Sequence, residues 1–137
     1  MSTESDRDNL RHGYSLWAAA DPAGVEFFLG MVSDQVDWGS LGEGRLGMEF
    51  SQRRSGREEV LGYFQDIAAN WELVSYQVHE IVSEGDRHVA ICECAWKHRA
   101  TGKVVETPKV DTYKMKDGKI VEFREYYDTA KTVAAAL

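Results

Sequence analysis

Apolar residues recur with helical spacing in the first half of the chain and with strand spacing in the second half. The first helical stripe lies at i, i+4, i+7 and i+8 and consists of Leu10, Tyr14, Trp17 and Ala18. Asp21-Pro22 is a typical N-cap and first-turn pair and predicts a second helix that buries Val25, Phe28, Leu29 and Val32. Ser55-x-x-Glu58 is a capping box and predicts a third helix, whose apolar face consists of Val60, Leu61, Phe64, Ile67, Ala68 and Trp71.

Four runs of alternating residues follow and predict strands at roughly 73–83, 88–98, 104–115 and 119–127. Asp117-Gly118, between two alternating runs, is the strongest hairpin signal. We also expect a short strand at 35–38, a glycine-rich loop at 39–56 with a short strand around 48–50, and a closing helix at 130–137. Helices first and an antiparallel meander afterwards predict an α+β fold, with helices covering one face of a curved sheet.

The composition is that of one globular domain, with 137 residues, 43% of them apolar and 28% charged. A net charge of −7 and a pI near 5.1 argue against nucleic-acid partners, which need a basic surface. No apolar run approaches the roughly 20 residues that span a bilayer, and the polar start predicts no signal peptide, so no membrane partner is expected. Cys92 and Cys94 are too few and too close for a disulfide framework, which favours a cytoplasmic location.

Two patterns that could bind a nucleotide or a metal lack the geometry that these ligands need. The glycine pattern at 42–47 has dinucleotide-loop spacing, but residues 48–50 do not begin a helix. His88, Cys92, Cys94 and His98 share one strand face, yet the two histidines are roughly 33 Å apart at about 3.3 Å per residue and cannot bind one ion. No cofactor and no metal are therefore predicted, and the glycine-rich loop is better suited to a mobile flap.

Four segments carry a resemblance to the nuclear-transport-factor-2-like superfamily and its SnoaL-like members: residues 14–21, 33–38, 54–58 and 117–129. The last of these is similar to the final hairpin and strand of SnoaL-like proteins, and the resemblance spans roughly 8–135. It implies a single domain over 1–137, in which a cone-shaped, mostly antiparallel sheet wraps around three N-terminal helices and encloses one pocket. It implies no particular activity, because this fold hosts enzymes, binding proteins and interaction domains.

Asp111 is the first candidate for chemistry. Alternation in 110–115 places Asp111, Tyr113 and Met115 on one strand face, where an acid is out of place unless that face lines a cavity. A buried carboxylic acid has a raised pKa and can donate a hydrogen bond while neutral. The segment 102–111 also resembles the part of ketosteroid isomerase that carries the protonated oxyanion-hole acid. The alternative is a structural acid bonded to the backbone or to Lys97 or Lys109.

Tyr14 and Asp37 follow from the same resemblance. Tyr14 is similar to the first-helix tyrosine of ketosteroid isomerase, and beside a neutral acid it would complete a two-donor oxyanion site. The alternative is a core aromatic residue. That family's general base is an aspartate of the first strand, where this chain has Gly39. Asp37 lies two residues earlier and serves as the base only if the register slips; otherwise it is a strand-end acid.

Glu125 is the last catalytic candidate. Alternation in 123–127 turns it inward, and its position resembles that of a catalytic acid in limonene epoxide hydrolase, which also uses an arginine and an aspartate of a neighbouring strand. The residues that look equivalent here are Glu93 and Ala95, so that trio is predicted to be absent. Glu125 and Glu93 could share a proton in a dry cavity, or Glu125 could pair with a lysine or arginine.

The favoured function is binding of a small apolar or aromatic compound with one carbonyl or hydroxyl group, anchored by Asp111 and Tyr14. Cofactor-free isomerisation or aldol-type cyclisation are the reactions to test first. The predicted pocket walls are Trp17, Trp38, Phe64, Tyr113, Met115, Phe123 and Tyr127. The alternative is a non-catalytic carrier or dimeric interaction domain with a filled pocket. A homodimer through the outer sheet face is expected, because Val110, Tyr126 and Trp96 leave apolar surface there.

Overall fold

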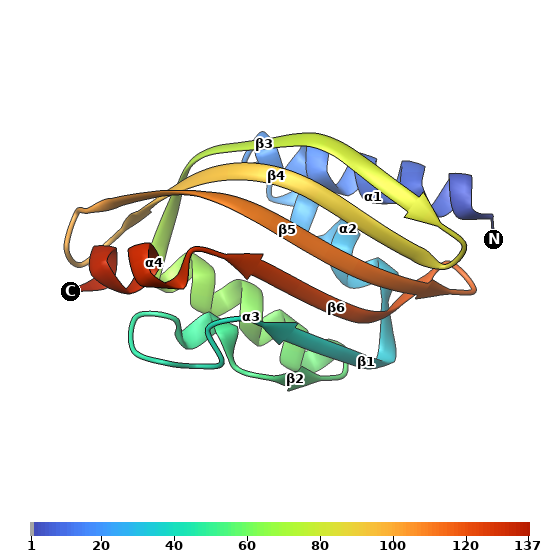
Figure 1. Cartoon of the computed structure of the whole chain (residues 1–137). Helices are drawn as coiled ribbons and strands as arrows, with labels where there is room; N and C mark the ends of the chain where they lie inside the picture. Colours follow the sequence, from blue (N-terminus) through green and yellow to red (C-terminus); the bar gives the residue numbers. More distant parts are fainter. Residues whose placement is uncertain (1) are drawn as a thin grey trace.

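The structure is a computed structural model that describes residues 2–137. Its helices are α1 (Thr3–Ala18), α2 (Ala23–Met31), α3 (Arg57–Asn70) and α4 (Thr129–Ala136), with a 3-10 turn η1 at Glu49–Ser51. Its strands are β1 (Val32–Ser40), β2 (Arg54–Ser55), β3 (Trp71–Glu84), β4 (Arg87–His98), β5 (Val104–Lys116) and β6 (Lys119–Tyr127). The long strands arch along one side of the first three helices, and the two labelled ends of the chain lie at opposite ends of the molecule (Figure 1).

Within residues 2–137 the strands form one six-stranded sheet in the order β2-β1-β6-β5-β4-β3. The strands β3 to β6 form an antiparallel meander, whereas β1 pairs with β6 in parallel. The β5–β6 register shifts between Lys114 and Met115, so that Asp111 lies opposite Glu125. The predicted α+β class with a curved, mostly antiparallel sheet is confirmed.

Local details in the first half differ from the sequence-based expectations. β1 covers nine residues rather than 35–38, because it pairs with both β2 and β6. Residues 49–51 form η1 instead of a strand. α3 starts after Gly56, whose φ of 85° favours glycine, and the acid that reaches back is Glu59 rather than Glu58. Its carboxylate accepts a hydrogen bond from the Ser55 backbone nitrogen at 3.0 Å.

The core lies between the inner face of the sheet and the helices that cover it. Leu10 of α1 and Val60 of α3 are fully buried there. Trp38 of β1 stacks on Phe123 of β6 with ring centroids 3.9 Å apart. In the described part of the chain, none of the helices is long and apolar enough to cross a membrane.

Candidate acid–base site

Three charged side chains project from two adjacent strands into the core. Lys109 and Asp111 are successive inward positions of β5, and Glu125 of β6 lies directly opposite Asp111. The side chain of Lys109 is 13% exposed, and those of Asp111 and Glu125 are 2% and 1% exposed. We call these residues the charged trio.

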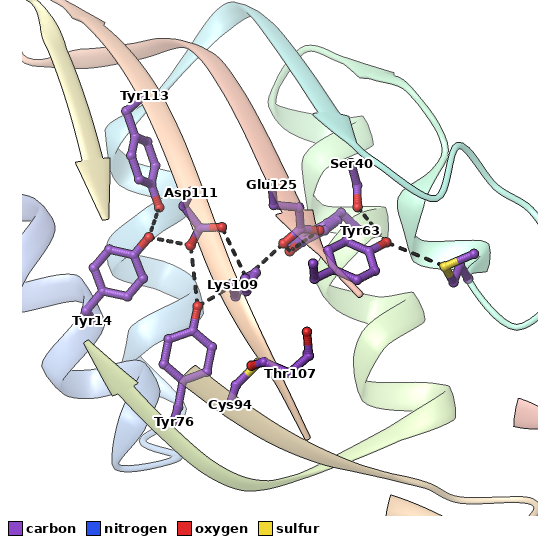
Figure 2. Close-up of polar contacts among 12 residues, drawn as sticks. Tyr14, Ser40, Tyr63, Tyr76, Cys94, Thr107, Lys109, Asp111, Tyr113 and Glu125 are labelled. Carbon is purple, nitrogen blue, oxygen red and sulfur yellow. Dashed lines mark hydrogen bonds and ion pairs between the residues drawn. The ribbon is translucent and has the colours of Figure 1, made fainter. Parts of the chain in front are cut away.

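The Lys109 ammonium lies between the two carboxylates (Figure 2). Its Nζ is 2.8 Å from Oε2 of Glu125 and 3.3 Å from Oδ1 of Asp111. It also donates to the hydroxyl of Tyr76 at 3.1 Å, and that hydroxyl lies 3.4 Å from Oδ2 of Asp111. Because like charges directly opposite one another on neighbouring strands are destabilising, the ammonium is what makes this pairing tolerable. Oδ1 of Asp111 has no hydrogen-bond partner of good geometry, so its contact with Lys109 is chiefly electrostatic.

Tyrosine hydroxyls from the helices reach both carboxylates. Tyr63 of α3 donates to Glu125, with its oxygen 2.9 and 3.0 Å from the two carboxylate oxygens. Tyr14 of α1 donates to Oδ2 of Asp111 at 2.5 Å, and the Tyr113 hydroxyl lies 2.7 Å from that of Tyr14. Each carboxylate therefore has a tyrosine donor on one side and Lys109 on the other.

Burial and neighbouring charges together shift the pKa values of these groups. It raises the pKa of Asp111, an effect that the charge of Lys109 opposes and that of Glu125 reinforces. Burial alone would lower the pKa of Lys109, but the neighbouring Asp111 and Glu125 hold that pKa well above its usual value, so the ammonium stays charged. Burial is also the main cause of pKa values well above normal in the surrounding tyrosines, which are therefore neutral donors: Tyr14, Tyr63, Tyr76 and Tyr113.

Two cavities meet at the trio. The larger holds about 490 Å³ of space free of protein atoms, open solvent at its mouth included. Its aromatic lining consists of Trp17, Phe50, Tyr63, Trp71, Trp96 and Tyr127, and we call it the aromatic cavity. The smaller, the tyrosine cavity, holds about 310 Å³ on the same measure and is lined by Tyr14, Tyr76 and Tyr113 among others. Lys109 borders both cavities, Glu125 only the first and Asp111 only the second.

The structure distributes the predicted pocket walls between these cavities. Trp17 borders both, and Tyr127 borders the aromatic cavity. The remaining walls of the tyrosine cavity include Trp38, Phe64, Tyr113 and Phe123. Met115 is buried opposite Ile120 and is not part of either lining.

The structure brings Tyr14 and Asp111 together. In an oxyanion hole, however, both groups would point at a substrate oxygen rather than at each other. The Tyr14 hydroxyl is directed at Asp111 itself, so the two groups bond to one another. Lys109 occupies the inward position two residues before Asp111, with its Nζ 3.3 Å from Oδ1 of Asp111. This arrangement agrees with the alternative in which Asp111 is bonded to Lys109.

Two predicted acids lie away from the cavities. Asp37 lies within β1, between β2 and β6, where Arg53 and Arg124 bond to its carboxylate at 2.8 Å and lower its pKa to about 2. Glu93 of β4 projects from the outer face of the sheet, away from the cavities. Its side chain is 66% exposed, and its Oε1 lies 3.8 Å from Nε2 of His79. The predicted Glu125–Glu93 pair does not form, because β5 separates β4 from β6 in the sheet.

The choice of Glu93 and Ala95 as the neighbouring-strand positions beside Glu125 is wrong. In the sheet β6 lies between β1 and β5, and β5 supplies Lys109 and Asp111, so an acid–cation–acid cluster forms with a lysine rather than an arginine as the cation. The signal was available, because the alternation that turns Asp111 inward also turns Lys109 inward. Tyr63 and Tyr76 were missed as well, since each sits in a segment whose apolar neighbours dominate the pattern.

Comparison with protein families gives one match. The family described as SnoaL-like domain matches residues 10–123. The chain belongs to this family. The predicted resemblance to SnoaL-like and nuclear-transport-factor-2-like proteins is thereby confirmed. A search of curated proteins finds no match.

Similar solved structures carry several descriptions. An NTF2-like protein from Burkholderia thailandensis superposes with a TM-score of 0.82 at 19% identity, covering 100% of this chain and 99% of that one. A candidate SnoaL-like polyketide cyclase from Jannaschia gives 0.81 at 14% identity, with 98% and 92% covered. An epoxide hydrolase of M. tuberculosis, described as LEH-like, gives 0.72 at 13% identity, with 98% and 90% covered. At these identities the likeness establishes the fold alone.

Proposed function

We propose that this SnoaL-like protein is a cofactor-free acid–base catalyst for a small, mostly apolar carbonyl compound, bound in the aromatic cavity. The observation that supports it is the charged trio beside that cavity. Lys109 can neutralise only one of the two carboxylates, and its Nζ lies closer to Glu125, at 2.8 Å, than to Asp111, at 3.3 Å, while burial raises the pKa of Asp111. Two carboxyl groups in different protonation states at one site are a typical acid–base arrangement.

The chemistry follows from the positions of these groups. Glu125 takes a proton from the carbon next to the substrate carbonyl, and the bonding electrons move onto the carbonyl oxygen. The Lys109 ammonium, which borders the same cavity, stabilises the resulting enolate. Return of the proton to another carbon completes an isomerisation. In a compound with a second carbonyl, the enolate carbon attacks that carbonyl carbon, the C=O π electrons move onto its oxygen, and the proton on Glu125 passes to this oxygen, which completes an aldol cyclisation. Asp111 and Tyr76 hold the ammonium in place.

Hydrogen–deuterium exchange tests this proposal. Cyclohexanone in D₂O is followed by proton NMR, and we expect the wild-type protein to accelerate exchange of the protons next to the carbonyl. Glu125→Gln should lower that rate by about 100-fold or more, because general-base catalysis contributes on this order. Glu93→Gln, on the outer face, is the matched control and should leave the rate unchanged. Equal rates in Glu125→Gln and wild type would refute Glu125 as the base.

Epoxide hydration is a second candidate, favoured by the acid–cation–acid order of Asp111, Lys109 and Glu125 on adjacent strands. Water attacks an epoxide carbon while Glu125 takes its proton, the carbon–oxygen bond breaks, and the Lys109 ammonium, which borders both cavities, gives a proton to the leaving oxygen and takes one from Asp111. The product is a diol. Incubation of cyclohexene oxide in ¹⁸O-water distinguishes this route, because one heavy oxygen must appear in the diol, at a rate that depends on Glu125.

A non-catalytic carrier or interaction domain is the alternative. Large side chains of the tyrosine cavity, among them Trp38 and Phe64, fill much of the space around Asp111 and favour this reading. The aromatic cavity favours an enzyme instead, because a carboxylate and an ammonium border its free space. Binding of cyclohexanone without any exchange above buffer would support the carrier.

A further inference from the structure

The aromatic cavity has an unusual lining for a pocket that takes a neutral compound. Three of its rings are tryptophans, from α1, β3 and β4: Trp17, Trp71 and Trp96. The rings do not form a parallel stack. Trp17 and Trp96 are inclined by 48°, and Phe50 is inclined by 35° to Tyr127 and by 74° to Tyr63. The cavity is therefore enclosed by aromatic rings from several directions.

The charges at this cavity do not balance. Among the residues that line it, the charged ones are Lys109 and Glu125. Asp111, which lines the tyrosine cavity, lies 3.3 Å from the Lys109 ammonium. One ammonium thus faces two carboxylates. Deep burial favours a site with zero net charge, because an uncompensated buried charge is costly.

Two additions can supply the missing positive charge. Asp111 can hold a proton, or a cation can enter the aromatic cavity next to Glu125. Aromatic faces attract cations through the electron density of their rings, and cages of such rings bind quaternary ammonium groups. The aromatic rings of the cavity and its unbalanced negative charge both favour an organic cation as the ligand.

We infer that the aromatic cavity binds the ammonium group of a small organic amine, with Glu125 as counter-ion and the tryptophan faces as walls. The substrate class is then an amine-bearing compound. This inference rests on the proposed function only for the choice of cavity, and it does not need turnover.

Binding is coupled to the proton on Asp111. The groups that face Asp111 are the charged Lys109 and Glu125, together with neutral side chains from four other positions: Tyr14, Tyr76, Cys92 and Tyr113. A monocation beside Glu125 makes the site neutral with Asp111 ionised. The ligand therefore displaces the proton, and binding releases up to one proton per site at any pH at which Asp111 is protonated in the free protein.

Choline and 3,3-dimethylbutan-1-ol form a matched pair of probes, since the alcohol has a carbon atom in place of the charged nitrogen. Isothermal titration of the whole chain should give at least tenfold tighter binding of choline. Tryptophan fluorescence should change with both probes, because three tryptophans line the cavity. Titration in buffers of different ionisation enthalpy should report proton release with choline and none with the alcohol.

Two isosteric variants test the charge argument. In Glu125→Gln and in Asp111→Asn, Lys109 faces a single carboxylate, so the site is neutral without a cation. Both variants should bind choline and the alcohol with equal affinity and should release no proton. Glu93→Gln on the outer face should keep both effects.

Equal affinities of the two probes for wild type, or no binding of choline, would overturn the inference. The same result with proton exchange of cyclohexanone retained leaves the proposed function standing, so the two can fail separately. A choline preference that survives in Glu125→Gln would also overturn it, because the attraction would then come from another site.

Discussion

The ammonium of Lys109 stabilises the two buried carboxylates of Asp111 and Glu125. In Lys109→Met the side chain keeps its length but two carboxylates face each other without a cation. We expect the free energy of unfolding at pH 7 to fall by about 3–5 kcal/mol, the usual cost of removing one partner of a buried ion pair. The loss should shrink in acid, because a protonated carboxyl no longer repels its neighbour. Urea denaturation measures this, with Lys114→Met as the control, and equal losses in both variants would contradict the argument.

Asp111 should make stability depend on pH with a definite sign. Burial raises its pKa above the ordinary value of 3.8, so the folded state holds the proton more tightly than the unfolded state. Its contribution to stability is complete below that ordinary value and is lost as pH rises through the folded-state pKa. Asp111→Asn lacks this term and should gain stability relative to wild type as pH rises. Urea denaturation at several values between about pH 4 and pH 8 measures the difference, and a constant difference would count against a raised pKa.

Strand alternation alone predicted which way Asp111 and Glu125 point, since each sits at an odd position among large apolar neighbours. The same rule applied to Lys109 predicts its inward position, but lysine is so seldom buried that composition argues against it. Asp37 was wrongly considered for the pocket because the pattern of one strand carries no signal of the charged residues on its neighbours. Its two arginine partners come from β6 and from the residue before β2.

At the scale of elements, the order and type of most helices and strands and the antiparallel meander could be predicted, whereas the register of β5 against β6 and the partners of β1 could not. An uninterrupted Asp117-Gly118 hairpin would extend the Lys116–Lys119 pair and place Asp111 opposite Arg124. The bulge shifts the register by one residue and brings Glu125 there instead. The parallel pairing of β1 with β6 is likewise invisible in the sequence, because a strand's pattern does not name its partner.

The entry to α3 depends on a glycine. Gly56 has φ 85° and ψ 161°, a conformation that is nearly restricted to glycine, and an added Cβ would lie 3.2 Å from the Asp34 carbonyl oxygen. Gly56→Ala should therefore cost about 1–3 kcal/mol of unfolding free energy. Gly30→Ala is the control, since it lies in α2 with no atom near the added Cβ, and should stabilise by up to about 1 kcal/mol. Thermal denaturation separates them; equal effects would argue against backbone strain at Gly56.

The closing helix α4 covers one end of the aromatic cavity rather than the centre of the core. Thr132 borders the cavity, and the Ala135 carbonyl accepts a hydrogen bond from Thr101 at 2.6 Å. Deleting residues 129–137 should lower the urea midpoint modestly, keep a single cooperative transition, and shift tryptophan emission to longer wavelength as the cavity opens. Complete unfolding on truncation would mean that α4 belongs to the main core.

For the whole molecule, the two faces of the sheet carry different kinds of residues. The inner face carries the charged trio and both cavities. The outer face carries an apolar stripe that crosses the strands, because Ile91, Val110 and Tyr126 are cross-strand neighbours. Trp96, which we had expected in this stripe, instead lines the aromatic cavity and contacts Trp17. The remaining stripe includes Tyr126, 46% exposed, and still offers apolar surface to a second copy.

Assembly through this outer face is the last prediction. A two-fold dimer brings the same stripe together from both copies. A single charged substitution in the stripe therefore places two like charges in the interface. Size exclusion with light scattering should report twice the 15.5 kDa chain mass for wild type. Tyr126→Glu should shift the protein to the monomer mass and leave choline binding intact, because the aromatic cavity lies on the other face. Leu61→Glu, an exposed position of α3, is the control and should remain dimeric. A wild-type protein that is monomeric at high micromolar concentration would exclude the outer face as an interface between copies.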